Sequence, residues 1–152
     1  MTYTNIALAN AIWVFHLLVV IFVLVAPFLN SPALWILHIT FCISLLVHWW
    51  GNSNVCSLSY LESSLRGLDY TQSFTHKFVS GIYDISKTEW SKITNDITIV
   101  LLCVSVYFLF KSDAFGKALK CFQEKQIEYR EHSFRTRMAE YIKCFEPLFM
   151  VC

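Results

Sequence analysis

Two long apolar runs dominate the first third of the chain. Segment 6–29 contains no charged residue and is long enough, at about 1.5 Å per helical residue, to cross a hydrocarbon core of roughly 30 Å. Segment 33–50 is also uncharged and ends in two tryptophans, which suit a membrane boundary. Between them, Asn30 and Ser31 form a polar break, and Pro32 suits the first turn of a helix. This pattern predicts a transmembrane helical hairpin.

A third apolar run lies at 93–110, and its upstream flank extends it. Ser86 and Glu89 have the Ser-x-x-Glu spacing of a capping box, so a helix that begins there would run into the bilayer and end at Lys111. The intervening segment 51–92 is too long for an idle connection in a compact protein. We therefore expect three spans and an interfacial helical segment, which together make a membrane domain over 1–111.

Two short helices are expected within the interfacial segment. Ser59 and Glu62 form a second capping box, in which the hydroxyl accepts from the amide of residue 62 and the carboxylate reaches back to the amide of residue 59. Further on, Phe74, Phe78 and Ile82 are spaced at i, i+4 and i+8, the stripe of an amphipathic helix. This part of the chain is predicted to lie on the membrane surface.

The C-terminal segment 112–152 differs from everything before it. From Lys111 onward the chain carries eight of its 12 basic residues and six of its 11 acidic ones. An apolar stripe continues at i, i+4, i+7 and i+11, made by Phe134, Met138, Tyr141 and Phe145. The pattern predicts an amphipathic helical tail whose stripe contacts a partner protein.

Composition and charge agree with a membrane protein. The chain is 56% apolar and 15% charged, with mean hydropathy +0.50, which is too apolar for an ordinary soluble domain. A net charge of +1 supplies no basic excess for a nucleic-acid backbone, so nucleic-acid binding is not expected. The connection between the first two spans has no Lys or Arg, whereas the tail is rich in both, so the positive-inside rule places the tail on the cytoplasmic side.

Histidines inside apolar spans are the most specific candidates for chemistry. Counted from the turn near Ser31, His16 and His48 differ in depth by about 3 Å, whereas His38 lies about 12 Å from His16. The first two could therefore be axial ligands of a haem or part of a metal site. Hydrogen bonds to neighbouring helices explain both residues without a cofactor, and we favour that interpretation.

Other reactive residues give weaker signals. Asp96, at the entrance of the third span, could serve an ion or proton pathway in an oligomer if it were buried there, but its position favours an interfacial, solvated carboxylate. The six cysteines form no C-x-x-C pair and are predicted to stay reduced and to pack. No hydrolase, zinc-protease, P-loop or dinucleotide-binding fingerprint occurs, so we expect neither an enzyme nor a bound cofactor.

One stretch resembles a known family. The chain has CSLSYLE at 56–62 and LRG at 65–67, preceded by His16 and His38 in apolar spans and followed by an aromatic segment that ends in Ile82-Tyr83. This pattern resembles a family of small, functionally uncharacterised integral-membrane proteins of bacteria and some large DNA viruses. The resemblance covers about residues 10–110. It has Ser59 where the bacterial pattern has Thr and Ser57 where Pro is usual, and its HWW run at 48–50 is more similar to the viral members.

The resemblance implies a membrane fold of three or four spans and no known activity. Its motif residues, His48, Cys56, Ser59, Glu62 and Arg66, have a structural explanation as a device that returns the chain to the membrane surface. We therefore expect an all-α, non-enzymatic structural membrane protein, an anchor for other structural proteins. A virion component that links an internal membrane to capsid proteins is the instance that the viral resemblance favours. The alternative is a small redox or haem-binding membrane protein.

Overall fold

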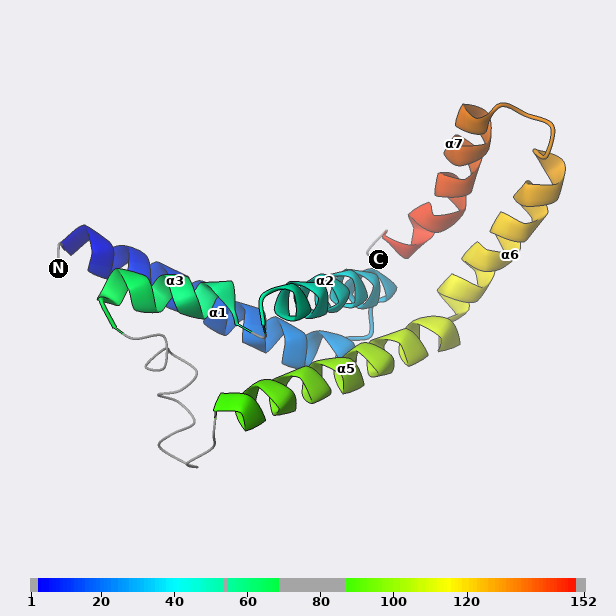
Figure 1. The fold of residues 1–152 in the computed structure, drawn as a ribbon. Coiled ribbons are helices and arrows are strands. Elements are labelled where there is room, and N and C mark those ends of the chain that lie inside the picture. The colour runs from blue at the N-terminus through cyan, green and yellow to red at the C-terminus, as the bar shows by residue number, and fades with distance from the viewer. Residues whose placement is uncertain (1–2, 54, 69–86, 150–152) are drawn as a thin grey trace.

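A computed structural model of the chain describes residues 3–53, 55–68 and 87–149 (Figure 1). In these ranges the protein is helical and has no strand, which confirms the all-α prediction. Within them, three segments are long and apolar enough to cross a membrane: Asn5–Phe28, Pro32–Gly51 and Ser91–Lys111. Each agrees with its predicted span to within two residues.

Proline and serine determine the turn between the first two long helices. Helix α1 (Tyr3–Val25) ends in the short 3-10 helix η1 (Ala26–Phe28), which contains Pro27. Helix α2 (Pro32–Gly51) then begins with Pro32 in its first turn, and the Ser31 side chain accepts a hydrogen bond from the backbone of Leu34. Proline lacks the N–H that a helix interior needs, so it is tolerated at these ends and not between them.

A buried polar cluster connects the three long helices. His38 of α2 lies with Nε2 3.1 Å from the carbonyl oxygen of Val23 on α1 and Nδ1 2.9 Å from the hydroxyl of Ser105 on α5 (Lys87–Lys111). The thiol of Cys42 lies 3.3 Å from His38 Nε2. All three of these side chains are fully buried. Polar groups that meet inside an apolar bundle satisfy one another, and here they also align three helices.

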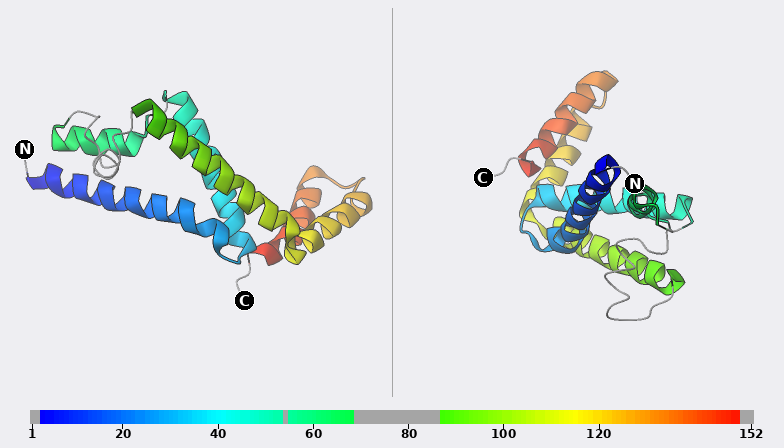
Figure 2. Two further views of the ribbon diagram at one scale, coloured as in Figure 1. Left: turned by 90° about the horizontal axis from the view of Figure 1, so that it is seen from below. Right: turned by 90° about the vertical axis from the view of Figure 1, so that its left-hand side faces the viewer.

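Helix α3 (Ser57–Arg66) packs along the N-terminal half of α1 and runs antiparallel to it, as Figures 1 and 2 show. Cys56 occupies the N-cap position and makes no side-chain capping bond, and Gly67 ends the helix in a left-handed conformation with φ 61°. The predicted capping box is wrong, because the helix begins before Ser59, which is buried within it. Glu62 forms its ion pair with Arg66 instead.

The tail forms a helical hairpin. Ser112 caps α6 (Asp113–Glu128) by accepting from the amide of Phe115, and Ser133 caps α7 (Phe134–Phe145) by accepting from the amide of Thr136. The 3-10 helix η3 (Glu146–Leu148) follows. The hairpin extends beyond the ends of the long helices, while the end of η3 returns to the turn between α1 and α2 (Figures 1 and 2).

The two ends of the helical bundle therefore differ. The N-terminus and α3 lie at one end, and the α1–α2 turn, the start of α6 and η3 lie at the other (Figure 2). The predicted amphipathic stripe of Phe74, Phe78 and Ile82 lies outside the described residues. So do Ser86 and the side chain of Glu89, the two partners of the capping box predicted before the third span.

Candidate functional sites

The first candidate site is the contact between α1 and α3, which we call the α1–α3 seam and define by Asn10, His16, Cys56, Ser59, Glu62, Ser63 and Arg66. On α3 the polar residues of the seam, Ser59, Glu62 and Ser63, are buried. The exposed positions between them include Tyr60 and Leu61, which are 60% and 48% exposed. The helix thus buries polar side chains and exposes Tyr60 and Leu61 together with Ser57 and Ser64, which partly reverses the pattern of a helix on a water-soluble protein.

An ion pair within α3 is linked to α1 by a hydrogen bond. Arg66 Nε lies 2.9 Å from Glu62 Oε1, and Arg66 Nη2 donates to Asn10 Oδ1 across the seam at 2.9 Å. The other carboxylate oxygen, Glu62 Oε2, is buried and has no hydrogen-bond partner in the described part of the chain. A buried carboxylate is costly unless it is paired, so the guanidinium is needed to keep this helix in place.

The thiol of Cys56 lies at the start of α3 and contacts α1. Its Sγ atom is 4.0 Å from His16 Nε2, and His16 is buried. Burial raises the pKa of this thiol, but the hydrogen bond with His16 and two backbone amides at the start of α3 lower the pKa by more. The result is a thiol with a pKa of about 7, which is partly ionised at neutral pH.

His48 is held by the turn that follows α2. Its Nδ1 accepts from the side-chain amide of Asn52 at 3.2 Å, and its Nε2 lies 3.0 Å from the Ser57 hydroxyl. His16 and His48 thus contact the neighbouring residues Cys56 and Ser57, in keeping with their predicted similar depth. Both ring nitrogens of His48 have protein partners, so axial ligation of a haem would require breaking these bonds.

No group of three or more His, Cys, Asp or Glu side chains that could hold a metal ion occurs within the described ranges. Asp96, the residue considered for a proton pathway, lies on the exposed side of α5, whereas Thr98 is buried. A carboxylate on the outside of a helix does not line a path through the bundle.

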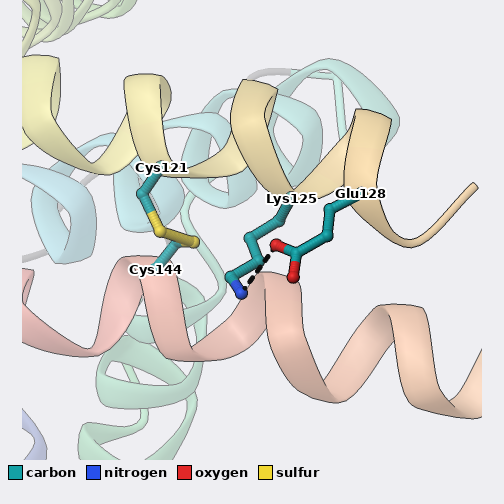
Figure 3. The surroundings of a disulfide bond; sticks show 4 residues. All are labelled: Cys121, Lys125, Glu128 and Cys144. Carbon is teal, nitrogen blue, oxygen red and sulfur yellow. Dashed lines mark hydrogen bonds and ion pairs between the residues drawn. A yellow bond between two sulfur atoms is a disulfide. The ribbon is translucent and has the colours of Figure 1, made fainter.

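The second candidate site is the hairpin of α6 and α7, whose interior contains a disulfide and a group of aromatic rings. Cys121 and Cys144 are joined, with Cα atoms 5.7 Å apart, as Figure 3 shows. Phe122 packs edge-to-face on Tyr141 at 4.8 Å and lies 6.0 Å from the ring of Phe145. The prediction of reduced cysteines is wrong for this pair. The hairpin brings together two residues that would lie far apart if the tail were one continuous helix. Among the described cysteines, Cys42, Cys56 and Cys103 are free.

The hairpin divides the predicted partner-binding stripe into two parts. Tyr141 and Phe145 face the hairpin interior. The residues that remain outside form what we call the α7 face. Its members are Phe134, Met138, Ile142 and Phe149, which are 69%, 43%, 64% and 57% exposed. Sequence reasoning missed Ile142 and Phe149, although 134, 138 and 142 have regular i, i+4, i+8 spacing.

No family model, curated protein or solved structure matches this chain. The chemistry of the protein is therefore inferred from its two candidate sites. The α1–α3 seam offers a thiol and a buried ion pair, and the hairpin offers an apolar surface on a covalently braced frame.

Proposed function

We propose that the protein is a multi-pass membrane anchor that holds a structural protein partner on the α7 face. The observation that carries this proposal is the exposed apolar stripe on a hairpin that is already braced by a disulfide. An apolar surface of this kind on a water-facing element is typical of protein interaction sites.

The surface of the long helices supports the membrane part of the proposal. Their exposed residues include large apolar side chains on each helix, such as Leu18 on α1, Val47 on α2, and Val100 and Phe110 on α5. Their buried residues include His38, Thr98 and Ser105. An apolar exterior, with polar side chains among the buried residues, suits a bilayer, where lipid solvates the outside and every polar group must be satisfied within the protein.

The rigidity of the hairpin supports its role in binding. The disulfide and the contacts of Phe122 hold α7 against α6 before any partner arrives. A surface that is already ordered loses less conformational entropy on binding than a free helical tail would. Bulky side chains such as Phe134 and Ile142 can then act as anchors in pockets of the partner.

The position of the hairpin favours a protein over lipid as the occupant of the α7 face. The face carries Phe134, Met138 and Ile142 on α7 and Phe149 directly after η3, on a hairpin that extends beyond the ends of the long helices (Figures 1 and 2). In the proposed topology this places the face outside the apolar spans, where a protein can cover it. The resemblance to virus-encoded proteins leads us to propose the inner side of a capsid shell, with the chain in the internal membrane of a virion.

The proposal is tested by cross-linking in the native membrane. A photoreactive residue in place of Phe134 should capture a capsid subunit, and the double change Met138→Asp and Ile142→Asp should lower the yield at least tenfold. Lys117→Asp, an exposed charge change on α6, is the control and should leave the yield unchanged. Tyr141 is unsuitable for this purpose, because it also packs on Phe122. Cross-linking to lipid alone, or an equal yield from the double variant, would contradict the proposal.

A further inference from the structure

Cys56 and His16 form a thiol–imidazole pair that anchoring does not require. The two residues are 40 positions apart in sequence and come from different elements, the N-cap of α3 and the middle of α1. A nucleophile and a base within reach of one another, fixed by separate elements, are the usual components of an activated thiol. Cys42, by comparison, is fully buried inside the bundle.

The start of α3 stabilises the thiolate form of Cys56. The backbone amides of Leu58 and Ser59 lie at the N-terminus of α3 and lower the pKa of the Cys56 thiol, in addition to the contact with His16, although neither makes a capping hydrogen bond to the sulfur. Amide groups at a helix N-terminus favour negative charge, which adds to the effect of the imidazole. Cys56 is partly exposed, whereas Cys42 is fully buried.

Apolar side chains are exposed on both helices of the seam, in addition to the exposed polar residues Ser53 and Ser57 that flank Cys56 in the chain. Tyr60 and Leu61 on α3 and Phe15 on α1, the neighbour of His16, are all exposed. Cys56 also follows the end of α2 by five residues, which makes it a juxtamembrane cysteine. A long hydrocarbon chain attached to this sulfur could lie along apolar side chains and lipid, and juxtamembrane cysteines are common sites of long-chain S-acylation.

The disulfide of the hairpin provides independent evidence about the side of the membrane. Disulfides persist in oxidising compartments, so Cys121–Cys144 favours the oxidising side for the tail. Three spans put Cys56 on the opposite, reducing side, where it stays a free thiol and where acyl thioesters of coenzyme A are present. This orientation is the reverse of the one that the distribution of Lys and Arg predicts.

We propose that Cys56 is an S-acylation site that accepts a long-chain fatty acyl group from an acyl-coenzyme A, with His16 as the base. His16 Nε2 takes the thiol proton, and the sulfur attacks the thioester carbonyl carbon. The bond from that carbon to the sulfur of coenzyme A breaks, and the departing thiolate takes the proton from the imidazolium. One thioester is exchanged for another, so no oxidant or reductant is needed.

The experiment uses the full-length protein in phosphatidylcholine vesicles with palmitoyl-coenzyme A at neutral pH, followed by intact mass analysis before and after hydroxylamine. Wild type should gain one hydroxylamine-sensitive palmitoyl group. Cys56→Ser should gain none, and His16→Gln should react at least fivefold more slowly. Cys103→Ser, which removes the exposed free cysteine of α5, is the matched control and should react like wild type.

A second measurement keeps the proposal testable if the His16 variant does not fold. Iodoacetamide should alkylate Cys56 at pH 7 on the order of fivefold faster in the folded protein than in the unfolded chain, because the larger thiolate fraction outweighs its lower intrinsic nucleophilicity. Slower alkylation in the folded protein would overturn the proposal. So would an absence of palmitoylation in wild type, or equal palmitoylation of wild type and Cys56→Ser.

Discussion

The α1–α3 seam and the α6–α7 hairpin are both contacts between two antiparallel helices, yet they bury opposite kinds of side chain. The seam encloses Ser59, Glu62 and Ser63 and exposes Leu61. The hairpin encloses aromatic rings and a disulfide and exposes charged residues such as Lys117, Lys120 and Glu124.

The difference is the one expected if the seam lies beside lipid and the hairpin in water, as the proposed topology places them. In water, burial would remove the hydration of the Glu62 carboxylate and replace it with a single ion pair, which costs free energy. Exposure of Leu61 to water would not stabilise the fold. Beside lipid, exposure of the Glu62 carboxylate to hydrocarbon would cost more free energy than burial next to Arg66, and an exposed leucine is well solvated by lipid. The interior of the hairpin follows the ordinary rule for water, with aromatic rings and the disulfide inside, whereas the α7 face departs from that rule. We therefore expect the two contacts to respond differently to the same change of residue.

Removal of the disulfide should have the largest effect, and only on the hairpin. Cys121→Ser together with Cys144→Ser opens a link with a sequence separation of 23, which in the chain-entropy description costs the hairpin about 3 kcal/mol. Limited proteolysis with and without reductant should show rapid cleavage within the tail, while the long helices stay protected. Equal protection of the tail in both proteins would contradict a braced hairpin.

The ion pair of the seam should be the next most sensitive feature. Arg66→Leu leaves the Glu62 carboxylate buried without its partner, and we expect a loss of about 2.5 kcal/mol, below the usual range for buried pairs because the Arg66 side chain is 28% exposed. The double change Glu62→Leu and Arg66→Leu should recover most of that loss. Denaturation of the reconstituted protein, followed by circular dichroism, measures both. If the double variant is as unstable as the single one, charge pairing is not what holds α3.

A pair of matched surface changes tests the comparison directly. Leu61→Asp places a carboxylate beside lipid and should cost about 2 kcal/mol, somewhat less than at the bilayer centre. Ile142→Asp makes the same kind of change at an exposed aliphatic residue of the hairpin, and it should lower the free energy of unfolding by less than about 0.5 kcal/mol. The same denaturation assay gives both values. Equal costs would mean that the two helix pairs face the same solvent.

The smallest effect is expected at the far end of the α7 face. Phe134→Ser removes a ring that is mostly exposed, so the stability of the hairpin should change by less than about 0.5 kcal/mol. Recovery of the cross-linked partner should nevertheless fall if the face binds a protein. A large loss of hairpin stability would show that Phe134 supports the fold and does not serve binding alone.

The three long helices could be predicted from sequence because each is a continuous apolar run with a clear boundary. Pro32 marks the start of α2 and Lys111 the end of α5. Such signals are local, and no knowledge of distant contacts is needed to interpret them.

The hairpin could not be predicted in the same way. Residues 129–133 contain neither glycine nor proline, so nothing punctuates the tail where it reverses, apart from the cap formed by Ser133. Without the reversal, Cys121 and Cys144 are unrelated, and Tyr141 is indistinguishable from the exposed Ile142 beside it. Pairing across a turn is a tertiary property that periodicity alone does not contain.

The seam was partly predictable. Depth along the helices relates His16 to His48, and the structure brings both to the turn before α3. The contact of His16 with Cys56 depends on how that turn crosses between helices, which the sequence does not specify. The capping-box prediction failed for a related reason, because burial of Ser59 against α1 outweighed its local tendency to start a helix.

The imidazole of His38 also imposes an order on assembly. Its ring contacts a backbone carbonyl of α1 and the hydroxyl of Ser105 on α5, and the latter is made 67 residues later in the chain. In the proposed topology the first two helices enter the bilayer before Ser105 does, and until then His38 Nδ1 has only the longer contact with the Cys42 thiol, at 3.8 Å. A chain truncated before Ser105 should therefore hold its first two helices together less firmly than the whole chain does.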